Sequence, residues 1–268
     1  MSPHLKRWIT GVIGVIILLG VIIYGTEAIF NGVIVLVIAG AVLEYHGMVF
    51  GRGDLWEKGE ILIAALLLAA AFIGGDARLV LATLTLSVLA VFFIYLSRIR
   101  EAAFEIVTVA KVAFGILYIP LTLGHFILVR RSDQGVLWIF VILDLAFAGD
   151  IAAFYVGRTW GRRKLLPLVS PGKTEEGILG LVAGSVLGCL IFRQLFLPAL
   201  PIVHTVVLGI AGSVIGQLGD LCESAIKRAS GVKDSGVILP GHGGLLDRLD
   251  CLIFIVPFVY YYRLFVIS

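Results

Sequence analysis

The sequence predicts an all-α, polytopic integral membrane protein with about nine transmembrane helices and a cytoplasmic N-terminus. Of its 268 residues, 60% are apolar and only 15% are charged, whereas a soluble domain has about 25% charged residues. Mean hydropathy is +1.07. So much apolar surface cannot be hidden in one core of this size, and lipid is therefore the expected solvent for most of it.

Nine apolar stretches approach the length of about 20 residues that a bilayer-spanning helix needs. The first follows Lys6 and Arg7, as in a signal peptide, but no small-residue cleavage site comes after it, so we interpret it as a transmembrane helix. The third is the shortest. The nine stretches are 8–24, 29–50, 61–73, 79–96, 112–129, 136–156, 178–197, 202–221 and 251–266.

The positive charges predict the orientation. With nine spans, 16 of the 21 Lys and Arg residues fall on one side of the membrane and five on the other, and the richer side is cytoplasmic by the positive-inside rule. This rule places loops 157–177 and 222–250 in the cytoplasm. The net charge of only +3 indicates no nucleic-acid partner. We expect the protein to lie in the inner (plasma) membrane.

Two regions are expected. Residues 1–130 would be N-terminal transmembrane helices of undefined role, and residues 131–268 a catalytic transmembrane region carrying both long cytoplasmic loops. In the second region Gly180, Gly184 and Gly188 recur every fourth residue, which is typical of closely packed helices. Small-residue faces of this kind also permit a homodimer.

A polar cluster follows the eighth span. If that helix continues past the membrane, Asp220, Glu223, Ser224 and Lys227 share one face, with Arg228 beside them. A carboxylate next to hydrocarbon is a functional candidate by default. Asp144 lies deeper in the sixth span, and two interpretations of it stay open: a site acid and an internally paired structural residue.

A glycine-rich stretch at 240–244 follows Lys233 and Asp234, and it permits backbone to approach a phosphate closely. We expect the next helix to begin near Leu245, with Asp247, Arg248 and Asp250 in its first turn. The earlier loop adds further candidates for the same site, which are Asp150, Arg158, Ser170 and Lys173.

These carboxylates suit Mg²⁺ or another divalent cation, which takes one or two of them and fills its remaining positions with water and phosphate oxygens. A second cation is left open. The neighbouring basic side chains would offset charge during a displacement at phosphorus. The candidate metal ligands are Asp220, Asp247, Asp250 and Asp150.

The order of these residues resembles the signature of the phosphatidate cytidylyltransferase (CDP-diacylglycerol synthase) family. The matching positions are Ser224, Lys227-Arg228, Lys233-Asp234, Pro240-Gly241-His242-Gly243-Gly244, Asp247-Arg248 and Asp250, preceded by Gly149-Asp150, Gly157-Arg158 and Ser170-Pro171-Gly172-Lys173-Thr174. The resemblance covers roughly the C-terminal half.

The resemblance implies a metal-dependent nucleotidyltransferase of phospholipid synthesis that takes CTP and phosphatidate and releases CDP-diacylglycerol and pyrophosphate. The active site would lie on the cytoplasmic side. As catalytic residues we assign Asp220, Asp247, Lys227, Arg228 and Lys173. As substrate-binding residues we assign Ser224, Glu223, Lys233, Asp234, His242, Gly243, Gly244, Arg248, Arg158 and Ser170.

Three alternative functions compete with this assignment. A CDP-alcohol phosphatidyltransferase would carry Asp-Gly-x-x-Ala-Arg, which is absent, and three residues rather than two between its last aspartates. A CTP-dependent polyprenol or phytol kinase would release CDP instead of pyrophosphate. A transporter would place charges near the midplane in repeated halves, whereas here the charges gather at one face without a repeat.

Overall fold

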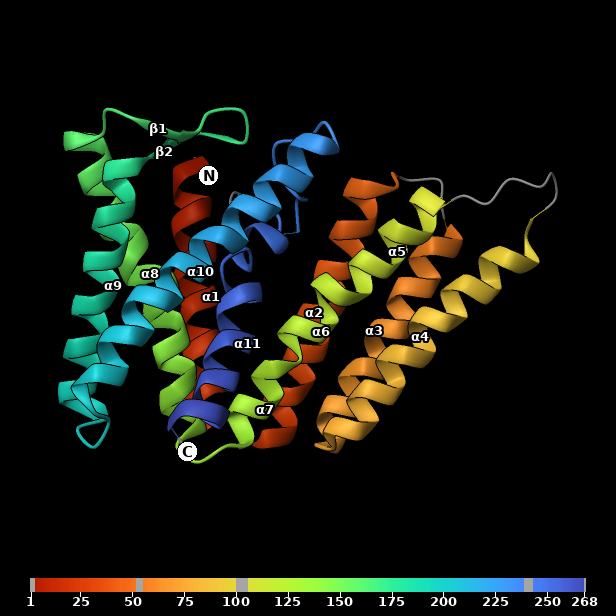
Figure 1. Cartoon of the computed structure of the whole chain (residues 1–268), viewed down its shortest axis with the longest axis horizontal. Coiled ribbons are helices and arrows are strands. Elements are labelled where there is room, and N and C mark those ends of the chain that lie inside the picture. Colours follow the sequence, from red (N-terminus) through yellow and green to blue (C-terminus); the bar gives the residue numbers. More distant parts are fainter. Residues whose placement is uncertain (1–2, 52–54, 100–105, 239–242, 268) are drawn as a thin grey trace. The chain divides into compact units, whose positions relative to one another are not determined.

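The computed structural model describes residues 3–51, 55–99, 106–238 and 243–267. The protein is helical almost throughout (Figure 1). The first helices are α1 (Pro3–Tyr24), α2 (Glu27–Val49), α3 (Leu55–Gly74), α4 (Ala77–Ser97), α5 (Ile106–Tyr118), α6 (Pro120–Leu123) and α7 (His125–Arg131). They are followed by α8 (Gly135–Trp160), β1 (Lys164–Leu166), β2 (Ser170–Thr174), α9 (Glu175–Phe196), α10 (Ile202–Ala229), the 3₁₀ helix η1 (Leu246–Arg248), α11 (Leu252–Tyr262) and the π-helical turn η2 (Arg263–Ile267).

The helices confirm the prediction of a helical membrane protein. Among the described residues, six helices are long and apolar enough to cross a membrane, and two shorter apolar helices are Gly11–Tyr24 and Leu252–Ile267. Large apolar side chains such as Ile16, Leu36 and Phe93 are mostly exposed, as a lipid solvent requires. Each of the nine predicted stretches coincides with helix, while the number of crossings and the orientation stay predictions.

The chain divides into two compact units, and each unit consists of two separate stretches of the sequence. The first unit comprises residues 1–128 and 234–247, and the second comprises 129–233 and 248–268. The stretch 234–247 therefore packs with the N-terminal helices, although its neighbours in the sequence belong to the second unit. The predicted functional division at residue 130 stays a prediction.

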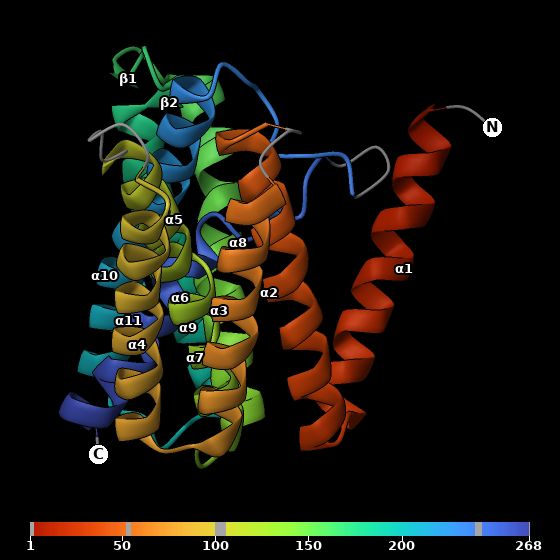
Figure 2. The same cartoon turned by 90° about the vertical axis from the view of Figure 1, so that its right-hand side faces the viewer.

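In the first unit, α2, α3 and α4 run as antiparallel neighbours (Figure 2), and α5 packs against α3. The buried Tyr45 of α2 donates its hydroxyl to the backbone oxygen of Lys111, at 2.8 Å. A Cβ at Gly115 would lie 2.7 Å from the Tyr45 ring, so the small residue lets α5 approach α2.

In the second unit, α8 and α9 lie side by side along most of their length (Figure 1), as the glycine spacing predicts. A Cβ on Gly180 would come within 2.7 Å of Val156, and one on Gly184 within 2.5 Å of Ala152. Helix α10 packs against α9 and α11. The predicted close packing is confirmed, and it brings the ends of α8, α9 and α10 together.

Two local expectations need correction. No helix begins at Leu245: Asp247 lies in the short 3₁₀ helix η1, Asp250 lies in the turn that follows it, and α11 starts only at Leu252. The backbone N–H groups of Gly244, Leu246 and Asp247 bond instead to the side chains of Asp247, Glu44 and Ser235, and the segment forms only one 3₁₀ turn. The predicted loop 157–177 contains a two-stranded antiparallel hairpin, in which Lys164 pairs with Thr174 and Leu166 with Ser170.

The glycine packing generates a stability prediction. Gly184→Leu should destabilise the protein by about 1–3 kcal/mol, because its side chain would enter space filled by Ala152 and the backbone of Ala148. The measurement is the thermal unfolding midpoint in detergent. Gly32→Leu is the matched control, since Gly32 is an exposed helical glycine with no atom within 4 Å of its Cβ position. Equal midpoints for both variants would contradict the packing argument.

Candidate active site

A cavity of about 360 Å³ lies in the second unit where α8, β2, α9 and α10 meet. It brings Asp220 of the predicted polar cluster together with the earlier candidates Asp150, Arg158 and Lys173, whereas none of the predicted residues that the structure describes in loop 222–250 lines it. Two acidic and two basic side chains line it, together with Gly157, Gly172 and Gly177, which have no side chains to fill the space. Its polar side chains are Asp150, Arg158, Lys173, Thr174, Gln217 and Asp220.

An ion pair links two walls of this cavity. The ammonium of Lys173 on β2 contacts the Asp220 carboxylate on α10. Both side chains are about three-quarters buried, with exposures of 22% and 26%. A pair this sheltered is screened less by salt than one in open water. It joins the hairpin to α10 and keeps one positive charge beside the principal candidate metal ligand.

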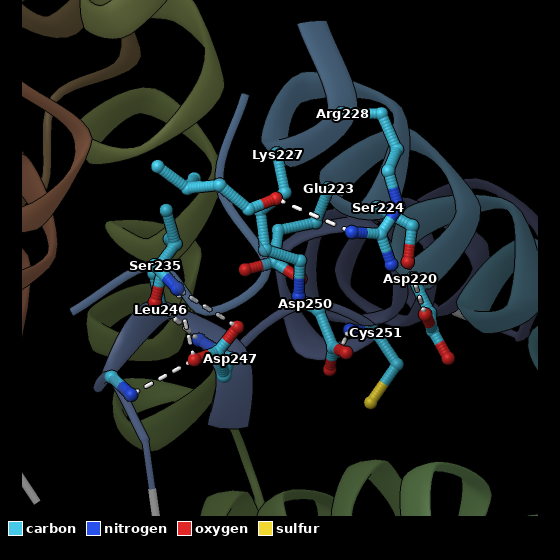
Figure 3. Close-up of polar contacts among 12 residues, drawn as sticks. Asp220, Glu223, Ser224, Lys227, Arg228, Ser235, Leu246, Asp247, Asp250 and Cys251 are labelled. Atoms are coloured by element: carbon cyan, nitrogen blue, oxygen red, sulfur yellow. Dashed lines mark hydrogen bonds and ion pairs between the residues drawn. The ribbon is translucent and has the colours of Figure 1, made fainter. Parts of the chain in front are cut away.

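The predicted polar face of α10 forms as expected, because α10 continues as one helix to Ala229. The hydroxyl of Ser224 donates to Asp220 Oδ1 at 3.4 Å. Glu223 is fully buried, and its Oε2 lies 2.6 Å from Nζ of Lys227. Figure 3 shows these side chains along one helix. The buried Glu223 thereby fixes the position of the Lys227 ammonium.

Arg228 lies on an exposed part of the same helix. Its guanidinium donates to the backbone oxygens of Val169 and Val232, at 3.4 and 3.3 Å. These bonds tie the end of α10 to the loop before β2 and to the loop that follows the helix. Arg228 therefore holds two loops together beside the cavity.

Thr174 connects the hairpin to α9. It is the buried N-cap of that helix, and its hydroxyl accepts the N–H of Gly177 at 3.1 Å. A Cβ on Gly157 would lie 3.0 Å from the same hydroxyl. The glycine in α8 thus allows the capped end of α9 to approach closely, and this contact sets one edge of the cavity.

Asp250 adds a further carboxylate to the second unit. Burial, and then the neighbouring charge of Asp220, raise the pKa of Asp250 to about 6, which the Cys251 N–H and the ammonium groups of Lys227 and Lys173 partly oppose. Its Oδ1 accepts the Cys251 N–H at 2.8 Å. The charge of Asp220 thus disfavours the ionised form of Asp250, and a cation bound beside Asp250 would relieve this effect.

Asp247 belongs to the first unit, where its carboxylate accepts two backbone N–H groups. One comes from Ser235 at 3.1 Å and one from Gly244 at 2.8 Å. Figure 3 labels Ser235 beside Asp247. Gly243 has a φ of +83°, a conformation that glycine adopts without strain. The hypothesis that Asp220 and Asp247 share one ion spans the two units and stays a prediction.

The chain matches a model of the cytidylyltransferase family over residues 5–266. It belongs to the cytidylyltransferase family. Phosphatidate cytidylyltransferases from Bacillus subtilis, Staphylococcus epidermidis and Haemophilus influenzae are 41%, 39% and 41% identical to it. These matches cover 57%, 59% and 50% of this chain, and 57%, 57% and 48% of the relatives. The chain thus aligns with about half the length of the curated relatives that it matches.

The remaining predicted residues that the structure describes in this family member do not line the cavity. Ser170 begins β2, while Lys233, Asp234 and Arg248 are exposed. His242 was predicted to bind substrate and lies outside the described residues. The roles assigned to all of these side chains stay predictions.

The cavity suits a magnesium ion that keeps much of its water and phosphate coordination. No group of three or more His, Cys, Asp or Glu side chains that could hold a metal occurs in the described part of the chain. One or two carboxylates are nevertheless the usual protein contribution to Mg²⁺ bound with a nucleotide. Asp220, with Asp150 in the cavity wall or Asp250 beside it, meets that smaller requirement.

Asp144 lies apart from the side chains that line this cavity. It interacts with the thiol of Cys189, and a Cβ on Gly188 would lie 2.6 Å from its Oδ1. Both neighbours are on α9, so the carboxylate packs against the facing helix. Of the two interpretations left open by the sequence, the structural one is favoured.

Three polar side chains, in the cavity and beside the segment that carries Asp247, were not predicted as site residues. Thr174 and Gln217 line the cavity, and Glu44 of α2 bonds to the segment that carries Asp247. The signal for Glu44 was an acid inside the apolar stretch 29–50, which is costly in a membrane and functional by default.

The Glu223–Lys227 pair generates a second prediction. Glu223→Ala should destabilise the protein by about 3–5 kcal/mol, because it leaves the Lys227 ammonium buried without its partner carboxylate. The double variant Glu223→Leu/Lys227→Met should recover most of the stability, since apolar replacements of a buried pair are often neutral. Thermal unfolding midpoints of the single and double variants in detergent measure this. A double variant no more stable than Glu223→Ala would contradict it.

Proposed function

We propose that this protein transfers the cytidylyl group of CTP to phosphatidate, giving CDP-diacylglycerol and pyrophosphate. The observation that supports it most directly is the cavity in which Asp150 and Asp220 face Arg158 and Lys173. Acids that can hold a metal, beside bases that can hold phosphates, are the groups required for displacement at phosphorus. Relatives named phosphatidate cytidylyltransferase select CTP and phosphatidate among the substrates that such a cavity suits.

The reaction needs little proton transfer. A phosphate oxygen of phosphatidate attacks the α-phosphorus of CTP, and a new P–O bond forms. The bond between the α-phosphorus and the oxygen that bridges to the β-phosphate breaks, and pyrophosphate leaves with that electron pair. A phosphate monoester has its second pKa near 6 and is already largely ionised, so no general base is required.

The chain contributes fixed charges to this displacement. Lys173 and Arg158 would bind the CTP phosphates and offset the charge that develops on pyrophosphate. Lys227, held by the buried Glu223, would supply a further positive charge that costs little reorganisation. Asp220, with Asp150 or Asp250, would hold Mg²⁺ in the second unit, and the ion would supply Lewis-acid stabilisation of the phosphates. A contribution of Asp247 to the same ion stays the prediction made from the sequence.

The location follows from the two substrates. The positive-inside asymmetry favours the cytoplasm for the ends of α8 and α10 that carry the cavity, and CTP would reach it from there. Phosphatidate would enter from the bilayer, with its acyl chains among the apolar helices. We therefore place the active site at the cytoplasmic face of the inner membrane.

Product analysis tests the proposal. Purified protein in detergent, given CTP, phosphatidate and Mg²⁺, should form CDP-diacylglycerol and pyrophosphate in equal amounts, and none without phosphatidate or after chelation of the metal by EDTA. Chromatography of labelled CTP and an enzymatic pyrophosphate assay measure both. Release of CDP would indicate the lipid-kinase alternative, and consumption of CDP-diacylglycerol with release of CMP would indicate the phosphatidyltransferase alternative; either result contradicts the proposal.

Asp220 should be indispensable to turnover. Asp220→Asn removes the charge that pairs with Lys173 and that would hold the cation, and the rate of CDP-diacylglycerol formation should fall about 100-fold to 1,000-fold. Asp76→Asn is the matched control, because Asp76 caps α4 by accepting the Arg78 N–H and asparagine caps equally well. Retention of more than a tenth of the wild-type rate in Asp220→Asn would remove Asp220 from the catalytic set.

A further inference from the structure

We propose that Glu44, on helix α2 of the first unit, is a positioning residue that holds the 234–247 segment and thereby orients Asp247. The inference deepens the proposed function, because it rests on Asp247 acting at the metal and nucleotide. It also assigns a role to N-terminal helices for which the sequence provides none. All the contacts that carry it lie within the first unit.

Glu44 is buried in a place where a carboxylate needs partners. Only 6% of the residue is exposed, and burial of an ionisable side chain without hydrogen bonds is costly. Its Oε2 accepts the backbone N–H of Leu246 at 2.8 Å and the hydroxyl of Ser235 at 3.2 Å. Both donors belong to the segment that carries Asp247, so this one oxygen joins α2 to both ends of that segment.

The segment is shaped around the carboxylate. A Cβ on Gly244 would lie 2.6 Å from Glu44 Oε2, and one on Gly236 would lie 2.6 Å from the Glu44 carboxyl carbon. Distances this short do not occur for real side chains, so only glycine fits at either position. Leu245 packs on the same helix, since a Cβ on Gly40 would meet its side chain at 2.8 Å. These close approaches indicate that the segment is packed specifically against Glu44 and helix α2.

Ser235 links Glu44 to Asp247 by hydrogen bonds. Its hydroxyl donates to Glu44 and accepts the backbone N–H of Asp247 at 3.2 Å, while its own N–H donates to the Asp247 carboxylate at 3.1 Å. Leu246, the other residue held by Glu44, directly precedes Asp247 in η1. Glu44 therefore fixes the backbone on both sides of the hydrogen bonds that orient the Asp247 carboxylate.

The second carboxylate oxygen of Glu44 allows a substitution by glutamine that keeps the hydrogen bonds of the first. Among the described residues, Oε1 has no hydrogen-bond partner. In Glu44→Gln the amide oxygen can accept both bonds, and the NH₂ group takes the place of the unpartnered oxygen. Glu44→Leu has a similar volume but no acceptor, so the two variants separate the hydrogen bonds from the space that the side chain fills.

The test measures turnover and amide exchange on the whole protein in detergent. Glu44→Leu should lower kcat for CDP-diacylglycerol formation about 10-fold to 100-fold, as expected when a catalytic group is displaced by about 1 Å, and should raise the Mg²⁺ concentration for half-maximal rate. Glu44→Gln should stay within about threefold of wild type in both. In hydrogen–deuterium exchange, the amides of Ser235, Gly244, Leu246 and Asp247 should lose protection in Glu44→Leu and keep it in Glu44→Gln.

A second variant tests the same link if Glu44→Leu does not fold. Should Glu44→Leu fail to fold, Ser235→Ala breaks the same link while leaving the Leu246 bond, and it should reduce kcat and the protection of the Asp247 amide. Wild-type rates and Mg²⁺ response in Glu44→Leu, or equal damage by Glu44→Gln and Glu44→Leu, would overturn the proposal. A wild-type protein inactive toward CTP and phosphatidate would refute the proposed function instead, and the exchange measurement would still decide the role of Glu44.

Discussion

The close approach of α8 to α9 is the constraint on which the second unit depends. Gly180 and Gly184 bring α9 against Val156 and Ala152 of α8, and Gly157 lets the capped end of α9 approach α8. Lipid gives helices little hydrophobic reason to associate, so van der Waals contact over small faces does much of the work. Because the cavity lies at the ends of these helices, its width depends on their spacing.

The charged groups are arranged by the cost of placing them near hydrocarbon. Lys173 pairs with Asp220 and Lys227 pairs with Glu223, so each ammonium stands beside a carboxylate. Such pairs hold charges in fixed positions. In the proposed reaction, substrate phosphates and a cation would exchange partners with charged groups that are already in position, as electrostatic stabilisation of a transition state requires.

The sequence could predict what periodicity and composition control. Helical segments followed from apolar length, the packed face of α9 from glycine spacing, and the shared face of Asp220, Ser224 and Lys227 from a continued helix. It could not predict the start of α11, because the backbone before that helix is held by long-range bonds from the Leu246 and Asp247 N–H groups to the side chains of Glu44 and Ser235. Glu44 lies 191 residues before Ser235, and no local pattern reports contacts at that separation. The hairpin was missed because three- and five-residue strands are too short to show alternation.

The interleaved order of the two units has a consequence for biosynthesis. Residues 1–128 emerge first but lack the strip 234–247 that completes their packing, and that strip leaves the ribosome only after α8, α9 and α10. Glu44 therefore gains its hydrogen-bond donors only after the chain has been synthesised through residue 246. A nascent chain arrested before residue 247 would hold an incompletely packed first unit, so this unit can finish packing only after α8, α9 and α10 have been synthesised.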